Sequence, residues 1–414
     1  MEQQELIPHL FRTEYRKITA VLCKLFGISH IEIAEDIASD TFLLASETWG
    51  HKGLPENPVA WLYKVASNKA KDYFKRDTLF HQKIVAQIAN SFATSTGEIE
   101  IDLSEKNIVD SQLQMMFAIC HPAIPVNAQI GLSLRILCGF GIEEIADAFL
   151  TNKETINKRL FRAKETLRIE KVKIEFPNKQ EINKRLEAVL ITLYLLFNEG
   201  YYSSSQNITL RQDLCLEAMR LTHLLIENPS TDAPSVNALI SLMCFHASRF
   251  EARTDKNGDT VLYQDQNTDL WNKELINKGM DYLSKASRGN EISKYHLEAN
   301  IAYWHTIKED TGQKWESILQ LHNQLLQVEY SPMAALNRTY ALSKANGKPE
   351  AIIAAEKLKL IDNHLYHSLL GELYTNIDNV KALMHFKDAL KLAKSTADKT
   401  IISNKILELS VQSN

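Results

Sequence analysis

The sequence has no long apolar run and no signal-like N-terminus. No stretch approaches the ~20 uninterrupted apolar residues that a membrane-spanning helix needs. The first five residues, Met-Glu-Gln-Gln-Glu, are polar and acidic, the opposite of a secretory signal peptide. We therefore expect a cytoplasmic chain without a membrane partner.

Paired cysteines are also absent. No two of the five cysteines form a Cys-x-x-Cys pair, and each lies among apolar residues, where a thiol usually serves as a small hydrophobic side chain. Cys120 and His121 could supply half of a metal site, but no second close pair of ligands accompanies them. We expect no metal and no other cofactor. Buried structural roles are predicted for Cys23, Cys120, Cys138, Cys215 and Cys244.

Enzyme motifs are missing as well. We find no nucleophile elbow, phosphate-binding loop, His-Glu-x-x-His metal motif or paired-carboxylate pattern. We therefore expect no catalytic residues and a protein that is not an enzyme.

Helix-breaking residues and strand-like alternation are scarce, which predicts an all-α fold. Only 14 glycines and 10 prolines punctuate 414 residues. With 45% hydrophobic residues, the chain can bury several cores. The net charge of −4 argues against a protein that coats nucleic acid with its whole surface, but it leaves room for local basic faces.

Composition and proline positions divide the chain into four segments. Residues 1–76 and 110–173 are two helical modules, and the polar residues 77–109 between them are predicted to form a linker. Residues 174–414 form a longer all-helical array that begins near Pro177, because proline cannot continue the preceding helix. A loop within one domain is the alternative for the linker, but so long a polar stretch is uncommon inside a domain.

The first module contains a helix with an acidic outer side. Residues 30–49 have no Lys or Arg, and their apolar positions follow helical spacing. Taken alone, such a face is usually solvated surface. The acidic residues are Glu32, Glu35, Asp36, Asp40 and Glu47.

A basic and aromatic helix follows. From Lys64 to Arg76 five basic residues stand against Asp72 alone, a net charge of +4 (5 minus 1). Cations suit the phosphates of a single nucleic-acid strand, and aromatic rings suit unstacked bases at ~1–3 kcal/mol per base. Core packing is the competing role for these rings, above all for Trp61. The interleaved aromatic residues are Trp61, Tyr63, Tyr73 and Phe74.

The second module contains a predicted helix-turn-helix. A short helix over residues 141–149 is followed by a turn at 150–152 and a longer helix over 153–168. Thr151 and Glu154 have the spacing of a capping box, which predicts the start of the second helix. Its buried seam is predicted to consist of Ile156, Leu160, Ala163 and Leu167.

The second helix of this motif is basic. Residues 153–173 hold eight basic and three acidic residues, a net charge of +5 (8 minus 3). Thr155, Lys158 and Arg162 lie opposite the predicted seam. In helix-turn-helix proteins such a second helix enters the major groove of DNA. An ordinary pair of antiparallel helices with a charged outer face is the alternative.

With both modules in view, residues 1–173 resemble an extracytoplasmic-function (ECF) sigma factor of bacterial RNA polymerase. Residues 35–36 (Glu-Asp) and 40–42 (Asp-Thr-Phe) resemble the acidic region 2 helix that docks on the β′ clamp. Residues 58–70 are similar to the family's −10 element helix, and residues 141–168 resemble region 4, which reads the −35 element.

Three further motifs resemble one subgroup of these factors, which carries a long C-terminal extension related to tetratricopeptide repeats. They are Ala-Ile-Cys-His-Pro-Ala at 118–123, Phe-Asn-Glu-Gly-Tyr at 197–201 and His-Ala-Ser-Arg at 246–249. The resemblance therefore spans nearly the whole chain. It implies an all-α protein made of a region 2 bundle, a region 4 helix-turn-helix and a helical extension.

The resemblance also implies partners and residue roles. The partners would be promoter DNA and core RNA polymerase, through its β′ clamp and β flap. Polymerase would be bound by Glu35, Asp36 and Asp40. The −10 strand would be lined by Trp61, Asn68 (holding an extruded base), Lys69, Lys71, Tyr73 and Arg76. The −35 duplex would be contacted by Thr155, Lys158, Arg159 and Arg162.

This sequence departs from the family pattern in two ways. Lysines replace several of the family's arginines, which keeps phosphate contacts but weakens planar bidentate readout. Glu154 stands where many relatives have a small residue, and an acid near the groove can repel phosphate or select cytosine.

From about residue 292 onward the helices suggest repeats. Asn337, Ala341 and Ala351 are followed at offsets of 33, 33 and 31 residues by Leu370, Tyr374 and Ala382. The pattern approximates a tetratricopeptide repeat, with generic helical hairpins as the alternative. Because repeat arrays bind proteins or peptides in a concave groove, we expect such a ligand here. Within a sigma factor the extension would regulate activity, by masking the DNA-reading modules or by supporting them.

Two other functions stay open on the sequence alone. One is a repeat-containing regulator that binds operator DNA without polymerase, although such a regulator has no use for the acidic helix before Trp49. The other is a scaffold in which the helix-turn-helix is only a hairpin, against which the net charge of +5 argues.

Overall fold

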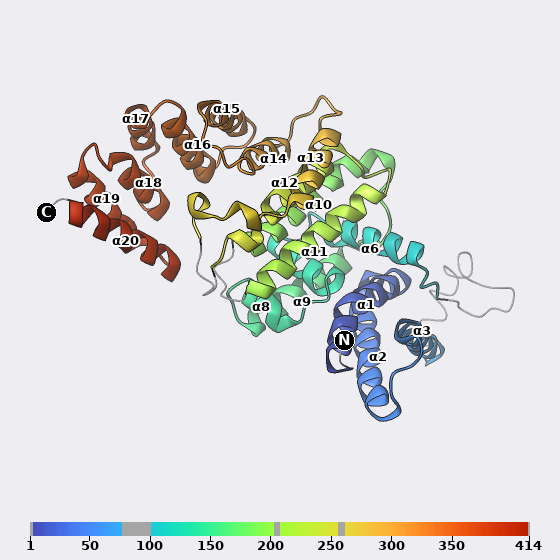
Figure 1. The fold of residues 1–414 in the computed structure, drawn as a ribbon. Helices are drawn as coiled ribbons and strands as arrows, with labels where there is room; N and C mark the ends of the chain where they lie inside the picture. The colour runs from blue at the N-terminus through green and yellow to red at the C-terminus, as the bar shows by residue number, and fades with distance from the viewer. Residues whose placement is uncertain (1–2, 77–100, 203–207, 256–260, 413–414) are drawn as a thin grey trace. The chain divides into compact units, whose positions relative to one another are not determined.

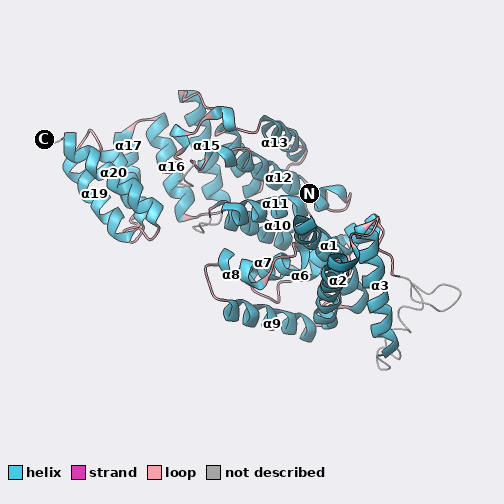
Figure 2. Cartoon of the chain, turned by 60° about the horizontal axis from the view of Figure 1, so that its bottom comes forward, coloured by secondary structure: helices cyan, strands magenta, loops and turns pink. Residues whose placement is uncertain are grey.

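The computed structural model describes residues 3–76, 101–202, 208–255 and 261–412 (Figure 1). These residues form 18 α-helices, and no β-strand occurs among them (Figure 2). The predicted all-α fold is therefore confirmed. None of the helices in these ranges has the length and apolarity that crossing a membrane requires.

The chain divides into two compact units, Met1–Thr231 and Asp232–Asn414. The first unit begins with α1 (Gln3–Phe26), the short 3₁₀ helix η1 (Ile28–His30), α2 (Ile31–Lys52) and α3 (Pro58–Arg76). Gly27 and Gly53 end α1 and α2 with φ values of +82° and +80°, a left-handed conformation that glycine adopts without steric cost.

The first unit continues with a second group of helices. These are α6 (Glu105–Ile119), α7 (Val126–Leu132), the π-helix η2 (Ser133–Leu137), α8 (Ile142–Ala148), α9 (Lys153–Ile169), α10 (Lys179–Tyr201) and α11 (Ile208–Glu227). Of the predicted linker 77–109, residues 77–100 lie outside the described ranges, and α6 begins within the remainder.

The boundary predicted at residue 173 does not coincide with the division between the units at 231/232. Helices α10 and α11 belong to the first unit, and α10 forms hydrogen bonds with polar groups of the helices before it. The Arg185 guanidinium donates to the carbonyl of Phe117 at 2.6 Å, and the Thr192 hydroxyl donates to Oε1 of Gln129 at 2.8 Å. Pro177 therefore separates two helices rather than two units.

The second unit is a succession of helices, each packed on a near neighbour in the chain. They are α12 (Pro234–Ala247), α13 (Lys273–Ala286), α14 (Lys294–Trp304), α15 (Gly312–Val328), α16 (Pro332–Ala345), α17 (Lys348–Leu358), α18 (His364–Tyr374), α19 (Asn379–Leu392) and α20 (Thr396–Gln412). Three short 3₁₀ helices, η3 (Phe250–Ala252), η4 (Tyr263–Asp265) and η5 (Thr268–Leu270), lie between α12 and α13.

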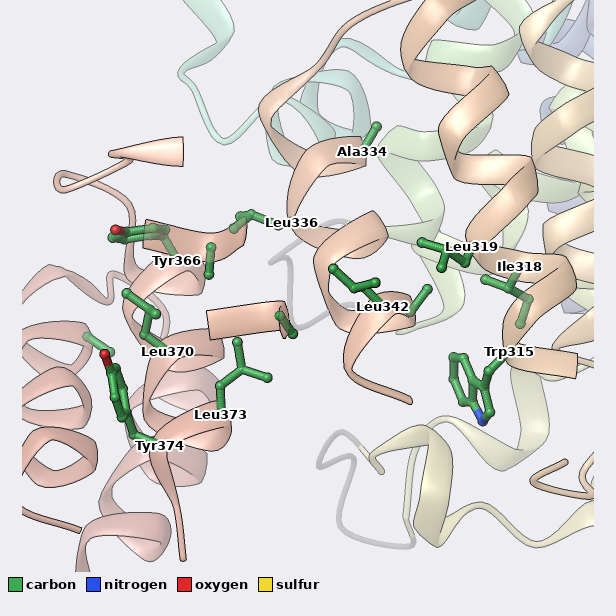
Figure 3. Close-up of a cluster of buried hydrophobic side chains, with 14 of the residues drawn as sticks. Trp315, Ile318, Leu319, Ala334, Leu336, Leu342, Tyr366, Leu370, Leu373 and Tyr374 are labelled. Carbon is green, nitrogen blue, oxygen red and sulfur yellow. The ribbon is translucent and has the colours of Figure 1, made fainter. Parts of the chain in front are cut away.

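The core of these helices contains most of the residues on which the repeat prediction rests, whereas Asn337 is exposed. Figure 3 shows side chains of α15, α16 and α18 in this core, among them Trp315, Leu342 and Leu370. At Gly371 a Cβ atom would lie 2.8 Å from the ring of Phe386, so α18 and α19 cross too closely for a larger residue. Both the tetratricopeptide prediction and the generic-hairpin alternative require such packing.

Buried histidines are a second property of this unit. Burial, together with the charges of Arg249 and Lys314, lowers the pKa of His305 to about 3. Burial and Arg338 lower the pKa of His322 to about 4. Both side chains are therefore neutral in the folded protein at neutral pH.

Acidification is expected to destabilise the second unit. An unfolded histidine has a pKa near ~6.5, so between that pH and about 3 the unfolded chain binds a proton at His305 that the folded chain does not bind. This contribution to stability is complete above pH ~6.5 and is lost as the pH falls, by roughly 2 kcal/mol between pH 7 and pH 5 for each such histidine.

The measurement is urea unfolding at pH 7 and pH 5, followed by tryptophan fluorescence. Three of the five tryptophans, Trp271, Trp304 and Trp315, lie in the second unit. Replacing His305 with Gln should make the decrease in unfolding free energy between pH 7 and pH 5 smaller by roughly 2 kcal/mol, the contribution of one such histidine. An equal loss in both proteins would contradict the prediction.

Candidate nucleic-acid interface

The helix-turn-helix forms with its predicted elements but with a different cap. Helix α9 begins at Lys153, and the residue before it, Asn152, accepts a hydrogen bond on its side chain from the Thr155 N–H at 2.8 Å. The predicted capping box of Thr151 and Glu154 is therefore wrong. A capping box requires the glutamate to be the third helical residue. Because Asn152 is the N-cap, Glu154 is the second.

The buried side of α9 agrees with the prediction. Ile156, Leu160, Ala163 and Leu167 are at most 4% exposed and form the seam that packs against the rest of the unit. In the turn before α9, Leu150 has a φ of +49°, a left-handed conformation that is uncommon for a leucine.

A groove of about 360 Å³ lies between α9 and the start of α7. All four predicted −35 residues contribute to its wall, namely Thr155, Lys158, Arg159 and Arg162. Three of them are exposed, whereas Arg159 is half-buried with its guanidinium 5.1 Å from the ring centre of Phe149. The structure therefore brings these four residues together.

The opposite wall of the groove is apolar. Ile124, Pro125 and Ala128, from the start of α7 and the turn before it, face the basic residues across the groove. A surface with cations on one side and apolar groups on the other can bind phosphate oxygens and contact the methyl group of thymine.

Two other basic residues of α9 do not face the groove. Lys153 forms an ion pair with Glu143 of α8. Lys164 lies on another side of the helix, where its ammonium contacts Glu35 at 2.7 Å and Glu32 at 3.4 Å. The basic residues behind the predicted net charge of +5 thus have two roles. Some line the groove, whereas Lys153 and Lys164 form ion pairs within the protein.

Helix α3 presents its predicted −10 residues in two different environments. Trp61 and Tyr73 are half-buried against aromatic neighbours, Trp49 at 5.3 Å and Phe26 at 5.5 Å between ring centres. Asn68 is exposed, and Lys69 and Lys71 are partly exposed. Arg76 ends α3, and its side chain lies outside the described part of the structure.

A third aromatic residue of α3 has a structural partner. The Tyr63 hydroxyl donates to Oε2 of the buried Glu14 at 2.6 Å. Burial and this carboxylate raise the pKa of Tyr63 well above its ordinary value. This hydrogen bond connects α3 to α1.

The predicted polymerase-binding residues on α2 are divided between the surface and the interior. Asp36 and Asp40 are exposed, and Asp40 lies 3.4 Å from the ammonium of Lys69 on α3. Glu35 is only 7% exposed. In this structure Glu35 therefore faces the protein, and only the two aspartates face solvent.

Glu35 is held by two basic residues that the sequence reasoning missed as its partners. Arg135 of η2 donates from Nε to Oε1 at 2.8 Å, and Lys164 of α9 contacts Oε2 at 2.7 Å. Burial lowers the pKa of Lys164, but the attraction of Glu35 and Glu32 outweighs it and leaves that pKa above its ordinary value. A sequence signal existed, because Arg135 is the only Asp, Glu, Lys or Arg between His121 and Glu143, and a buried charge needs a partner.

The cysteines and other possible ligands do not add a second site. All five cysteines are buried, as predicted. Among the described residues, no three His, Cys, Asp or Glu side chains gather into a metal-binding group.

Comparison with known proteins identifies a relative that matches most of this chain. The uncharacterized protein R00370 of Rhizobium meliloti is 30% identical over 387 residues, which cover 92% of this chain and 91% of that protein. This chain belongs to the same family. A model for a family of unknown function, DUF6596, also matches residues 185–287. No solved structure matches the chain.

Part of the chain is similar to ECF sigma factors. The ECF RNA polymerase sigma-E factor of Haemophilus influenzae is 29% identical over 110 residues, which cover 26% of this chain and 58% of that factor. The RNA polymerase sigma-H factor of Pseudomonas aeruginosa is 24% identical over 179 residues, which cover 40% of this chain and 92% of that factor. This chain thus contains a sigma-factor-like region.

The cap of α9 generates a prediction. Replacing Asn152 with Ala removes the acceptor for the Thr155 N–H, which should reduce the local stability of the first turn by about 1 kcal/mol. Amide hydrogen exchange in this turn, measured by mass spectrometry, should become roughly fivefold faster. The Thr151→Ala variant is the matched control, and an equal acceleration in both variants would contradict the assignment of the cap.

Proposed function

We propose that this protein is an ECF-type sigma factor that directs core RNA polymerase to specific promoters. It is not an enzyme, and it acts in the cytoplasm, where polymerase and promoters are found. The observation that carries the proposal is the groove on α9, because one helix-turn-helix surface collects Thr155, Lys158, Arg159 and Arg162. The similarity to sigma-E and sigma-H factors supports it.

In this proposal each helix has a separate partner. Helix α9 enters the major groove at the −35 element, with lysines on phosphates and arginines available for guanine edges. Helix α3 lies along the melted −10 strand, where Asn68 is exposed and Lys69 and Lys71 are partly exposed. The exposed Asp36 and Asp40 of α2 bind the β′ clamp, and the helix-turn-helix module meets the β flap.

The helical extension regulates this activity and offers a surface for a protein or peptide ligand. Its first two helices, α10 and α11, are part of the first unit, so they act directly on the DNA-reading modules. A regulator that binds operator DNA without polymerase is the competing function, and the exposed acids on α2 favour the sigma-type function over it.

Charge reversal at Lys158 and Arg162 together tests the DNA-binding role of α9. Repulsion of phosphate should weaken promoter binding by about two orders of magnitude or more. Binding to core polymerase should be kept, because the β′ clamp is bound by α2 and the two replaced residues lie in the proposed DNA-binding groove of α9. Run-off transcription and gel-shift assays measure the first effect, and a pull-down with core polymerase measures the second.

A matched control carries the same charge change on another exposed helix. Lys179 and Lys184 of α10 are exposed, so the variant Lys179→Glu/Lys184→Glu should keep promoter binding. Loss of DNA binding and polymerase binding together in the α9 variant would contradict the proposed separation of roles. Binding of duplex sites by a chain that ignores core polymerase would favour the competing function.

A further inference from the structure

Arg135 connects the helix-turn-helix module to the first bundle. Its guanidinium donates to Glu35 of α2 at 2.8 Å and to the carbonyl of Phe140 at 3.2 Å, and it lies 5.7 Å from the ring centre of Tyr15 of α1. Arg135 and Glu35 are 100 residues apart in the chain. A contact of this kind fixes the two modules against each other.

Lys164 of α9 makes the same connection to Glu35. Its side chain is 16% exposed, and the Glu35 side chain is 10% exposed, so water screens their 2.7 Å contact only weakly. Removing one partner from so buried an ion pair leaves the other charge uncompensated. Helices α2 and α9 are therefore joined by more than a surface salt bridge.

Helix α11 adds a second ionic connection. Glu217 pairs with Arg16 of α1 and, at 2.8 Å, with Arg220 of its own helix. Arg220 also donates to the carbonyl of Leu137 in η2 at 2.7 Å. A helix of the extension thus holds α1 and η2 at the same time.

These contacts limit how far apart the two DNA-reading helices lie. Lys164 of α9 contacts Glu35, and Lys69 of α3 contacts Asp40, five residues further along α2. Five helical residues rise ~7.5 Å, so with the side chains included the two lysine backbones lie within roughly 35 Å of each other. Promoter elements centred at −10 and −35 are about 25 base pairs apart, roughly 85 Å of duplex. One chain in this arrangement cannot occupy both elements.

We propose that the structure is a closed, self-inhibited state, latched by Glu35 with Arg135 and Lys164 and by Glu217 with Arg16. This inference rests on the proposed sigma-type function. A basic surface of polymerase competes with Arg135 and Lys164 for the acids of α2, and the exchange of partners releases α9 from α2. The apparent affinity for polymerase is reduced by the fraction of molecules that are closed.

The first experiment uses the unmodified full chain. A zero-length carbodiimide reagent joins an amine to a carboxylate only when the two are in contact, and mass spectrometry identifies the joined peptides. We expect a bond from Lys164 to Glu32 or Glu35 in the free chain, and a loss of about tenfold or more when core polymerase is saturating. The pair of Lys153 and Glu143 lies wholly within the helix-turn-helix and should be joined equally in both samples.

Two results of this experiment would overturn the latch. One is that the free chain shows no cross-link from Lys164 to Glu32 or Glu35, although it shows the control cross-link from Lys153 to Glu143. The other is that the Lys164 cross-link is as little reduced by polymerase as the control cross-link. If core polymerase does not bind the chain at all, the proposed function fails, and with it the competition. In that case the cross-link in the free chain tests only whether Lys164 and Glu35 are in contact.

The second experiment measures affinity for core polymerase. The variant Lys164→Gln/Glu217→Gln leaves Glu35 with Arg135 alone, which weakens the first latch, and it removes the Glu217 carboxylate of the second. It should bind polymerase about fivefold more tightly or better. Lys153→Gln removes an ion pair from the same helix and should leave the affinity unchanged. Equal affinities in all three proteins would contradict the latch. If the double variant does not fold, the cross-link in the unmodified chain decides the question.

Discussion

The carboxylate of Glu35 is the charge around which the first unit is organised. A buried ion loses several kcal/mol of hydration, so it needs partners with good geometry. Here the partners come from η2 and α9, 100 and 129 residues away in the chain. Because Arg135 and Lys164 share one acceptor group, α2, η2 and α9 are held as a single body.

The same helix serves two purposes on its different faces. Glu35 faces the protein, while Asp36 and Asp40 face solvent. An acidic helix that closes the molecule on itself can also bind a basic partner, provided that the internal cations are displaced. The extension also affects the balance between the closed and open states, because Glu217 of the second latch belongs to α11.

Local features could be read from the sequence, whereas long-range pairings could not. The start of α9 and the buried seam of Ile156 and Leu167 follow from helical periodicity, which needs no knowledge of the rest of the fold. The cap was misplaced by one residue because Thr151 and Asn152 are both good caps. The Lys164 side chain points inward because Glu35 of α2 lies beside it. The spacing of residues along α9 does not predict where α2 lies. A proline at 177 predicts a helix end, but only tertiary contacts such as Arg185 with Phe117 show that the unit continues.

The most direct test of this account is the distance between α2 and α9 in the full chain. Since all five cysteines are buried, spin labels can be directed to cysteines introduced at the exposed positions Ser46 and Asn157. Double electron–electron resonance should give one short distance in the free chain and a much longer one when core polymerase and promoter DNA are bound. A distance that is unchanged in the transcribing complex, or already long in the free chain, would contradict the closed state.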